Sequence, residues 1–212
     1  MRSVGKAWTI LGARRRGSSV SFEVIAPEGD DHQRRRCRGC GYIEYVNPKI
    51  VCGSVATLKA EGQPERILLC KRSIEPRKNY WTLPAGYMEL GETAEEGAAR
   101  EAYEEAGAKI RVTSLLAVYS LKHISQVQLL YQAELASDDL SPGLESLEVG
   151  LFTANEIPWE QLAFPTTSWA LMHHSKQHQG QGPFSNPCDP ASAPFWSPSG
   201  WSSGHNWVGH KF

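Results

Sequence analysis

Apolar residues fall into short blocks along the middle of the chain, and the blocks differ in period. Runs rich in valine, isoleucine and leucine, bounded by glycine, proline or charged residues, indicate buried β-strands. Such strands are predicted at residues 50–58, 66–72, 110–121, 126–134 and 147–152, and a short strand broken by a Pro/Gly loop is predicted at 81–86. A helical period is present at 93–106, and a second helix is predicted at 168–176. The regular patterns therefore predict one folded domain over residues 49–176.

The first predicted helix carries recognisable signals at both ends. Thr93 is followed three residues later by Glu96, which is the pattern of a capping box. Gly107 stands where a left-handed C-cap residue is favoured. Inside the helix, Gly97 costs about 1 kcal/mol relative to alanine, so its presence indicates that another element approaches closely. Small residues spaced by four also favour close packing on a sheet; they are Ala94, Ala98, Ala102 and Ala106.

The start of the chain is basic and contains serine. Five arginines and lysines precede the first acid, Glu23. This composition predicts a flexible basic segment over residues 1–30, and it is also typical of an organelle transit peptide. Five cysteines at irregular spacings indicate a reducing compartment rather than a disulfide framework. We therefore expect a cytoplasmic protein, or a chloroplast or mitochondrial one if the start acts as a transit segment.

The end of the chain, residues 177–212, has a different composition. It is rich in glycine, proline and serine and shows neither helical nor strand periodicity. Composition predicts a disordered tail. A disordered tail does not explain the presence of three tryptophans, Trp196, Trp201 and Trp207.

Overall composition narrows the class of partner. The formal net charge is -1, which does not favour binding to nucleic acid or to an anionic membrane. No apolar run approaches the roughly 18 residues that a membrane span needs. Hydrophobic residues make up 41% of the chain, enough for a buried core. These features indicate a globular protein and favour neither nucleic acid nor a membrane as its partner.

Glutamates gather on one side of the first helix. Glu101 and Glu105 lie one turn apart, with Glu104 beside them. Like charges at this spacing repel in a bare helix, and a divalent cation would remove the conflict. Carboxylate oxygens are the ligands that Mg²⁺ and Mn²⁺ prefer. By itself, the pattern also fits a solvated acidic helix face.

The spacing of these residues resembles the Nudix box. That motif has fixed positions for glycine, glutamate, arginine–glutamate, paired glutamates and a final glycine. All seven are filled here, by Gly86, Glu92, Arg100, Glu101, Glu104, Glu105 and Gly107. Each residue type makes up roughly 6–7% of an average chain, so a chance match is on the order of one in a million. The resemblance favours a metal site over a solvated face.

The resemblance implies a fold, a chemistry and roles for these residues. The fold would be an α/β/α sandwich around a mixed β-sheet, with the box forming a loop, the first helix and a second loop. The cofactor would be Mg²⁺ or Mn²⁺, and the reaction would be hydrolysis of a pyrophosphate linkage. The implied metal ligands are Glu92, Glu101, Glu104, Glu105 and the backbone carbonyl of Ala85. Arg100 would orient the carboxylates, and Glu104 and Glu105 would take part in catalysis.

A further carboxylate outside the box often acts as the base in such enzymes. The candidates here are Glu145 and Glu148, in the run that precedes and enters the last predicted strand. The alternative is that both are acids of a loop and a strand edge.

Several further motifs resemble one Nudix subgroup, the ADP-ribose and FAD pyrophosphatases with an N-terminal zinc ribbon. They include Cys37-Arg-Gly-Cys40, Leu69-Cys-Lys-Arg72 and Trp81-Thr-Leu-Pro-Ala-Gly86. A zinc ribbon needs two cysteine pairs, and residues 31–48 hold only Cys37 and Cys40. The segment is therefore expected to be a partial zinc-ribbon-like knuckle, either with Zn²⁺ or as a tight turn alone.

Three functions from different classes follow. The first is a hydrolase that converts FAD to FMN and AMP, or ADP-ribose to AMP and ribose 5-phosphate. The second is a catalytically silent nucleotide sensor, which usually goes with broken box glutamates. The third is a zinc-ribbon adaptor for nucleic acid, which the near-neutral charge disfavours. NADH and nucleoside triphosphates remain alternative substrates, and a homodimer is a family expectation.

Overall fold

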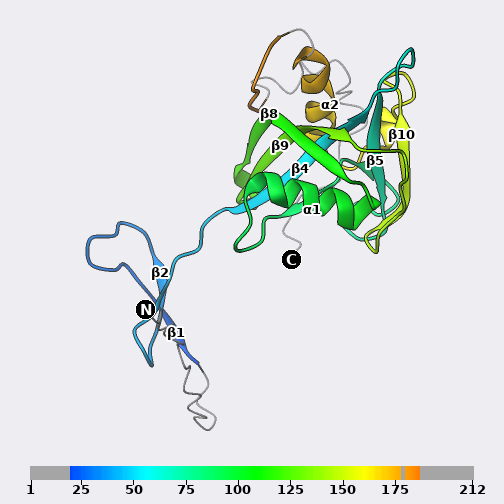
Figure 1. Ribbon diagram of the computed structural model, residues 1–212. Coiled ribbons are helices and arrows are strands. Elements are labelled where there is room, and N and C mark those ends of the chain that lie inside the picture. Colours follow the sequence, from blue (N-terminus) through cyan, green and yellow to red (C-terminus); the bar gives the residue numbers. More distant parts are fainter. Residues whose placement is uncertain (1–19, 178–179, 187–212) are drawn as a thin grey trace, which may run out of the picture. The chain divides into compact units, whose positions relative to one another are not determined.

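The computed structural model describes residues 20–177 and 180–186 (Figure 1). The chain divides into two compact units, one ending at Asn47 and the other beginning at Pro48. This boundary lies one residue before the predicted start of the main domain. Predictions for the basic start, for most of the tail and for the three tail tryptophans fall outside the described residues: 1–19, 178–179 and 187–212.

The small unit is a three-stranded antiparallel sheet in the order β1-β2-β3. Its strands are β1 (Phe22–Ile25), β2 (Arg34–Cys37) and β3 (Ile43–Glu44). Strand β1 lies inside the segment expected to be flexible, so that expectation is wrong for these four residues. The cause is pairing across the hairpin, since Glu23 is opposite Arg36 and accepts hydrogen bonds from its guanidinium. Asp30 accepts a hydrogen bond from Arg34 Nε at 2.8 Å near the turn.

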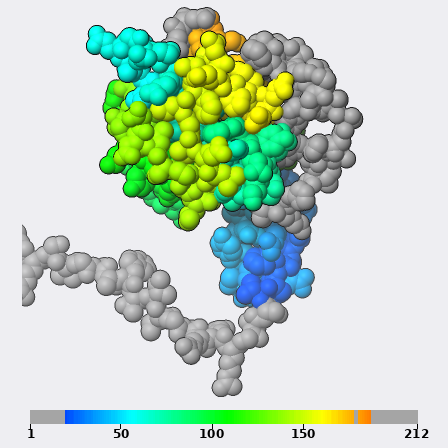
Figure 2. All heavy atoms as spheres, turned by 90° about the vertical axis from the view of Figure 1, so that its right-hand side faces the viewer, coloured from blue at the N-terminus to red at the C-terminus, as the bar shows by residue number. Residues whose placement is uncertain are grey.

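The larger unit is built on a seven-stranded sheet. Its path runs β10-β5-β4-β9-β8, with β6 beside β5 and β7 beside β4. β4 is parallel to β9 and the other pairs are antiparallel, so the sheet is mixed. The edge strand β10 faces the viewer in Figure 2. The strands are β4 (Lys49–Leu58), β5 (Arg66–Arg72), β6 (Trp81–Thr82), β7 (Ala85–Tyr87), β8 (Ile110–Leu121), β9 (Gln126–Leu135) and β10 (Ser146–Phe152).

Two helices cover opposite faces of this sheet (Figure 1). They are α1 (Ala94–Ala106) and α2 (Pro165–Gln177), accompanied by the short 3-10 turns Lys122–Ile124 and Trp159–Gln161. Because successive side chains of a strand point to opposite faces, Leu68 and Cys70 of β5 pack with α1, while Leu69 packs with α2. The predicted α/β/α sandwich around a mixed sheet is confirmed.

The ends of α1 are those expected from its sequence. Thr93 and Glu96 form both hydrogen bonds of the capping box, and Gly107 has φ 62° in the left-handed region. Gly97 faces β4, where an added Cβ would lie 3.3 Å from the Cβ of Cys52. The predicted reason for a glycine inside the helix is therefore confirmed. α2 begins three residues earlier than predicted, because a proline at its first position favours helix initiation.

Part of the predicted tail is attached to the sheet. The Phe184 ring stacks on His173 of α2, with centroids 4.3 Å apart and an interplanar angle of 7°. Its backbone pairs with β8, because Phe184 N donates to Leu116 O and Val118 N donates to Phe184 O, each at 2.9 Å. Composition alone missed this contact because it depends on residues far away in the sequence. The prediction of a disordered tail is wrong for residues 180–186.

No helix among the described residues is long and apolar enough to cross a membrane.

Candidate active site

Two carboxylates of α1 are turned towards the sheet. Glu101 and Glu105 are 9% and 7% exposed, although carboxylates are seldom so deeply buried. The loop that enters β7 lies over them, and the backbone N–H of Ala85 donates a hydrogen bond to Glu105. The fold therefore brings Glu101 and Glu105 together with Ala85, whose backbone carbonyl is the further metal ligand that the resemblance implies.

Gly86 permits this close approach. A Cβ built on Gly86 would overlap the carboxylate of Glu101. Only a residue without a side chain lets the β7 backbone lie directly against that carboxylate.

We expect Gly86→Ala to displace Glu101 and to lower both metal affinity and turnover about 10- to 100-fold, as for loss of a group that orients a metal ligand. A titration with Mn²⁺ and a rate measurement would check this. Gly39→Ala in the small unit is the matched control, since Gly39 has no positive φ and the nearest atom to the added Cβ is the Cys37 sulfur at 3.8 Å, an ordinary contact. Equal metal affinity in Gly86→Ala and wild type would contradict the assigned position of Glu101.

Arg100 connects the carboxylates of the helix and the preceding loop. Its Nε and Nη2 donate to the two oxygens of Glu92 at 3.0 and 2.8 Å. Its Nη1 donates to Glu101 Oε1 at 2.7 Å and to Glu104 Oε2 at 2.8 Å. Nη2 also donates to the backbone carbonyl of Tyr87 at 3.0 Å. The planar guanidinium therefore positions three glutamates at once, as its five donors allow.

The charges of the site are unequally compensated. Hydrogen bonds from Arg100 lower the pKa of Glu92 to about 2. Burial raises the pKa of Glu101 against the opposing effect of Arg100. Burial also raises the pKa of Glu105 to about 8, and the nearby charge of Glu101 adds to this shift. A buried carboxylate pair whose ionised form is this unfavourable fits a bound divalent cation, which supplies the missing positive charge.

The raised pKa of Glu105 predicts a pH dependence for metal binding. Without metal, folded Glu105 keeps a proton between its ordinary value of 4.5 and about 8. A cation must displace that proton, so apparent affinity should rise about tenfold per pH unit across this window and level off above it. The unfolded chain releases the proton earlier, so metal-free stability should fall as pH rises over the same range.

Calorimetric Mn²⁺ titrations between pH 5.5 and 9 would check this dependence. Glu105→Gln should remove most of it, because glutamine carries no titrating proton. A flat profile in the wild-type protein would show that Glu105 is ionised throughout.

Glu145 and Glu148 occupy different surroundings. The charge of Glu145 raises the pKa values of both Glu101 and Glu105. The loop that carries Glu145 is also joined to α1, because Gly143 N donates to Glu105 O at 3.0 Å. Glu148 instead forms an ion pair with Lys71 at 3.2 Å. The Lys71 ammonium lies 5.7 Å from the ring of Trp81, which packs with α2 on the other face of the sheet. Of the two candidates for the base, geometry favours Glu145.

Not every predicted residue joins the buried pair. The side chain of Glu104 is 56% exposed and is held by Arg100. Sequence reasoning also missed Arg72, the cation that lowers the pKa of Glu105. The signal available for it was strand alternation, which places Arg72 on the same face as Cys70, towards α1. Among the described residues, the tightest acid and histidine group is elsewhere, at Asp30, Asp31 and His32 of the small unit.

The cysteine segment forms a tight turn. Cys37 N donates to Tyr42 O at 2.8 Å, and Gly41 N donates to Cys37 O at 2.9 Å. Backbone N–H groups of Cys40 and Gly39 donate to the Cys37 sulfur and lower the pKa of that thiol. Both cysteines are free thiols. Two thiols do not complete a tetrahedral zinc site by themselves.

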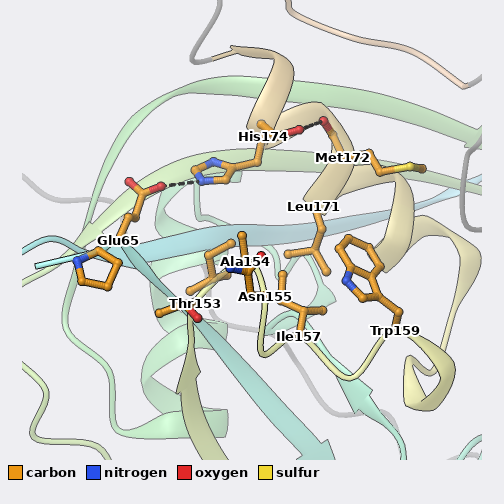
Figure 3. Close-up of a pocket in the computed structure, with 12 residues that line it drawn as sticks. Glu65, Thr153, Ala154, Asn155, Ile157, Trp159, Leu171, Met172 and His174 are labelled. Atoms are coloured by element: carbon orange, nitrogen blue, oxygen red, sulfur yellow. Dashed lines mark hydrogen bonds and ion pairs between the residues drawn. The ribbon is translucent and has the colours of Figure 1, made fainter.

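A separate hollow of about 490 Å³ lies between the start of β5, the loop after β10 and α2 (Figure 3). Apolar side chains, among them Ile67, Trp159 and Leu171, form its walls. At one end His174 Nε2 lies 3.0 Å from Glu65 Oε2. This hollow is on the α2 side of the sheet, opposite the face that carries the glutamates of α1, and it offers one carboxylate. It is therefore a poor candidate for the metal site.

Comparison with known proteins gives a consistent set of similarities. A family model described as the NUDIX domain matches residues 52–172. An ADP-ribose pyrophosphatase of Methanocaldococcus jannaschii is 32% identical over 129 residues, which are 58% of this chain and 71% of that protein. The crystal structure of a NUDIX hydrolase from Nitrosomonas europaea is 42% identical with a TM-score of 0.71, covering 81% of this chain and 96% of that one. The NAD-capped RNA hydrolase NudC of Haemophilus influenzae is 33% identical over 76 residues, which are 36% of this chain and 28% of that protein.

Proposed function

This chain belongs to the Nudix family of hydrolases, and from that premise we propose that it cleaves the pyrophosphate linkage of a nucleoside diphosphate joined to a second group. The buried pair Glu101 and Glu105 beneath the β7 backbone carries the proposal. Two carboxylates at this burial, with raised pKa values, favour a divalent cation more than any structural role.

ADP-ribose is the favoured substrate, with FAD beside it. The similarity to an ADP-ribose pyrophosphatase supports the first, and the subgroup motifs such as Cys37-Arg-Gly-Cys40 support both. Hydrolysis would give AMP and ribose 5-phosphate, or AMP and FMN. The partner is accordingly a small nucleotide. Homodimer formation is a further family expectation.

The cation would be Mg²⁺ or Mn²⁺, held by Glu101 and Glu105 with help from Glu104, Glu92 and the Ala85 carbonyl. When bound, it supplies positive charge against the phosphate oxygens and Lewis acidity for the attacking water. The carboxylates have to be ionised to act as ligands.

The protein's own groups then perform three tasks. Arg100 holds Glu92, Glu101 and Glu104 in fixed directions through its hydrogen bonds. Glu145 accepts a proton from the water that attacks one phosphorus. The anhydride P–O bond breaks, the water oxygen stays on the attacked phosphate, and the other phosphate leaves as a monophosphate.

A product assay tests this proposal. The purified protein is incubated with ADP-ribose, FAD, NADH or a nucleoside triphosphate, in Mg²⁺, in Mn²⁺ and in EDTA. We expect AMP with ribose 5-phosphate or FMN in either metal and none in EDTA. A folded protein that binds Mn²⁺ and nucleotide but turns over none of the four would replace the hydrolase with a nucleotide sensor.

A further inference from the structure

Arg72 is the last residue of β5, and the proposed hydrolysis gives it no part. Its partner in β10 is Ser146, the neighbour of Glu145. Ser73 N donates to the Glu145 carbonyl at 2.8 Å, so the chain after Arg72 is joined to the loop that carries the candidate base. That loop in turn rests on α1, since Gly143 N donates to Glu105 O at 3.0 Å. In Figure 2 the teal segment after β5 and the yellow-green loop before β10 lie side by side.

The guanidinium of Arg72 is held on two sides. Its Nε donates to the Pro76 carbonyl at 2.8 Å. Its Cζ lies over the Phe164 ring, 5.1 Å from the centroid. These contacts fix the plane of the group while using one of its five N–H donors. Neither Nη atom has a hydrogen-bond partner among the described residues, and neither is sealed from solvent.

Arg72 also lies near the carboxylates of the site without an ion pair to either of them. Its charge acts on Glu105, and those of Glu105 and Glu145 act on it. No carboxylate in the described part of the chain lies within the 4.0 Å ion-pair distance of its nitrogens. A fixed cation that lies near an acidic site, and whose two terminal nitrogens bind no described protein group, is arranged to receive an anion.

We propose that Arg72 binds the diphosphate of the substrate, through a two-point contact from its Nη atoms to phosphate oxygens opposite the carboxylates of α1. The inference rests on the proposed function. A guanidinium fork matches the geometry of phosphate oxygens. The substrate's diphosphate would then be clasped from two sides, by the metal site on α1 and by Arg72 on β5.

The competing role is structural, in which Arg72 serves only as a counter-charge that keeps Glu105 in place. The two roles move metal affinity in opposite directions. A cation beside the site repels a metal ion, so removing a mere phosphate ligand leaves Mn²⁺ affinity unchanged or raises it. Removing a group that positions Glu105 lowers Mn²⁺ affinity together with turnover.

The experiment compares wild type with R72Q, R72K and R66Q. Mn²⁺ binding is measured without nucleotide, and binding of α,β-methylene-ADP, whose bridging carbon resists hydrolysis, is measured calorimetrically with Mg²⁺. In R72Q we expect affinity for the analogue to fall about 10- to 100-fold, the range for a lost charge-assisted contact. Mn²⁺ affinity should be unchanged or higher. R72K keeps the charge without the fork and should fall between R72Q and wild type.

R66Q is the matched control, because Arg66 lies at the other end of the same strand and forms its ion pair with Asp138, at 3.8 Å. It should bind both probes as wild type does. Unchanged analogue affinity in R72Q, or a parallel loss of Mn²⁺ affinity, overturns the inference. A wild-type protein that binds Mn²⁺ but not the analogue overturns the proposed function and the inference with it. Should R72Q fail to fold, R72K is compared with wild type instead: lower affinity for the analogue with unchanged or higher Mn²⁺ affinity supports the inference, and any other result overturns it.

Discussion

Replacing Glu105 with glutamine is expected to reduce turnover on the order of 10³-fold, because a lost metal ligand removes several kcal/mol of charge stabilisation from the transition state. Glu105 is the more deeply buried carboxylate of the pair, and burial raises its pKa to about 8. Glutamine has nearly the same shape, can still accept the hydrogen bond from Ala85 and cannot provide an ionised oxygen.

The same substitution should not unfold the protein. Burial disfavours the charged form of Glu105, so an uncharged side chain should leave the free energy of unfolding equal or higher above pH 8 without metal. Rate measurements at saturating Mg²⁺ and urea denaturation would test both parts. Glu61→Gln in the exposed β4–β5 turn removes one charge away from the site and serves as the control. A Glu105→Gln enzyme within tenfold of wild type would contradict the assigned metal site.

Replacing Arg100 with glutamine should have the second-largest effect. Arg100 makes five hydrogen bonds, to Glu92, Glu101, Glu104 and the Tyr87 carbonyl. Without it, three glutamates lose their common partner and repel one another. We expect turnover to fall about 100-fold, as for loss of a group that orients metal ligands, and unfolding free energy to fall by about 1–3 kcal/mol.

Arg100→Lys separates charge from geometry. Lysine keeps the positive charge but lacks the planar fork, so it should recover part of the stability and little of the turnover. Steady-state kinetics and urea denaturation of both variants would measure the two contributions. Wild-type turnover in Arg100→Lys would show that charge alone, rather than the direction of each hydrogen bond, is what the site requires.

Local signals predicted much of the fold and part of the site. Thr93, Glu96 and Gly107 gave the bounds of α1 because capping depends on residues a few positions apart. Apolar runs bounded by glycine, proline or charged residues predicted β4, β5 and β8 to β10 to within about two residues, the usual spread at element ends. The roles of the box glutamates came from resemblance, because spacing alone fits a solvated helix face equally well.

Other features depend on distant contacts that no local pattern carries. The stacking of Phe184 on His173 and the pairing of Glu23 with Arg36 are of this kind. So is the position of Arg72, which becomes notable only when β5 lies beside β10. The burial of Glu105 could not be predicted either, because the sequence of an acidic helix face does not show whether that face meets solvent or a sheet.

Hydrolysis of ADP-ribose in ¹⁸O-enriched water with Mg²⁺ tests the central claim most directly. Mass spectrometry of the products should find AMP and ribose 5-phosphate, with one ¹⁸O atom in one of the two and none in the other. That result would establish that water attacks a phosphorus of the diphosphate. Absence of cleavage by a metal-loaded protein, or release of ADP with ¹⁸O in free ribose, would contradict it.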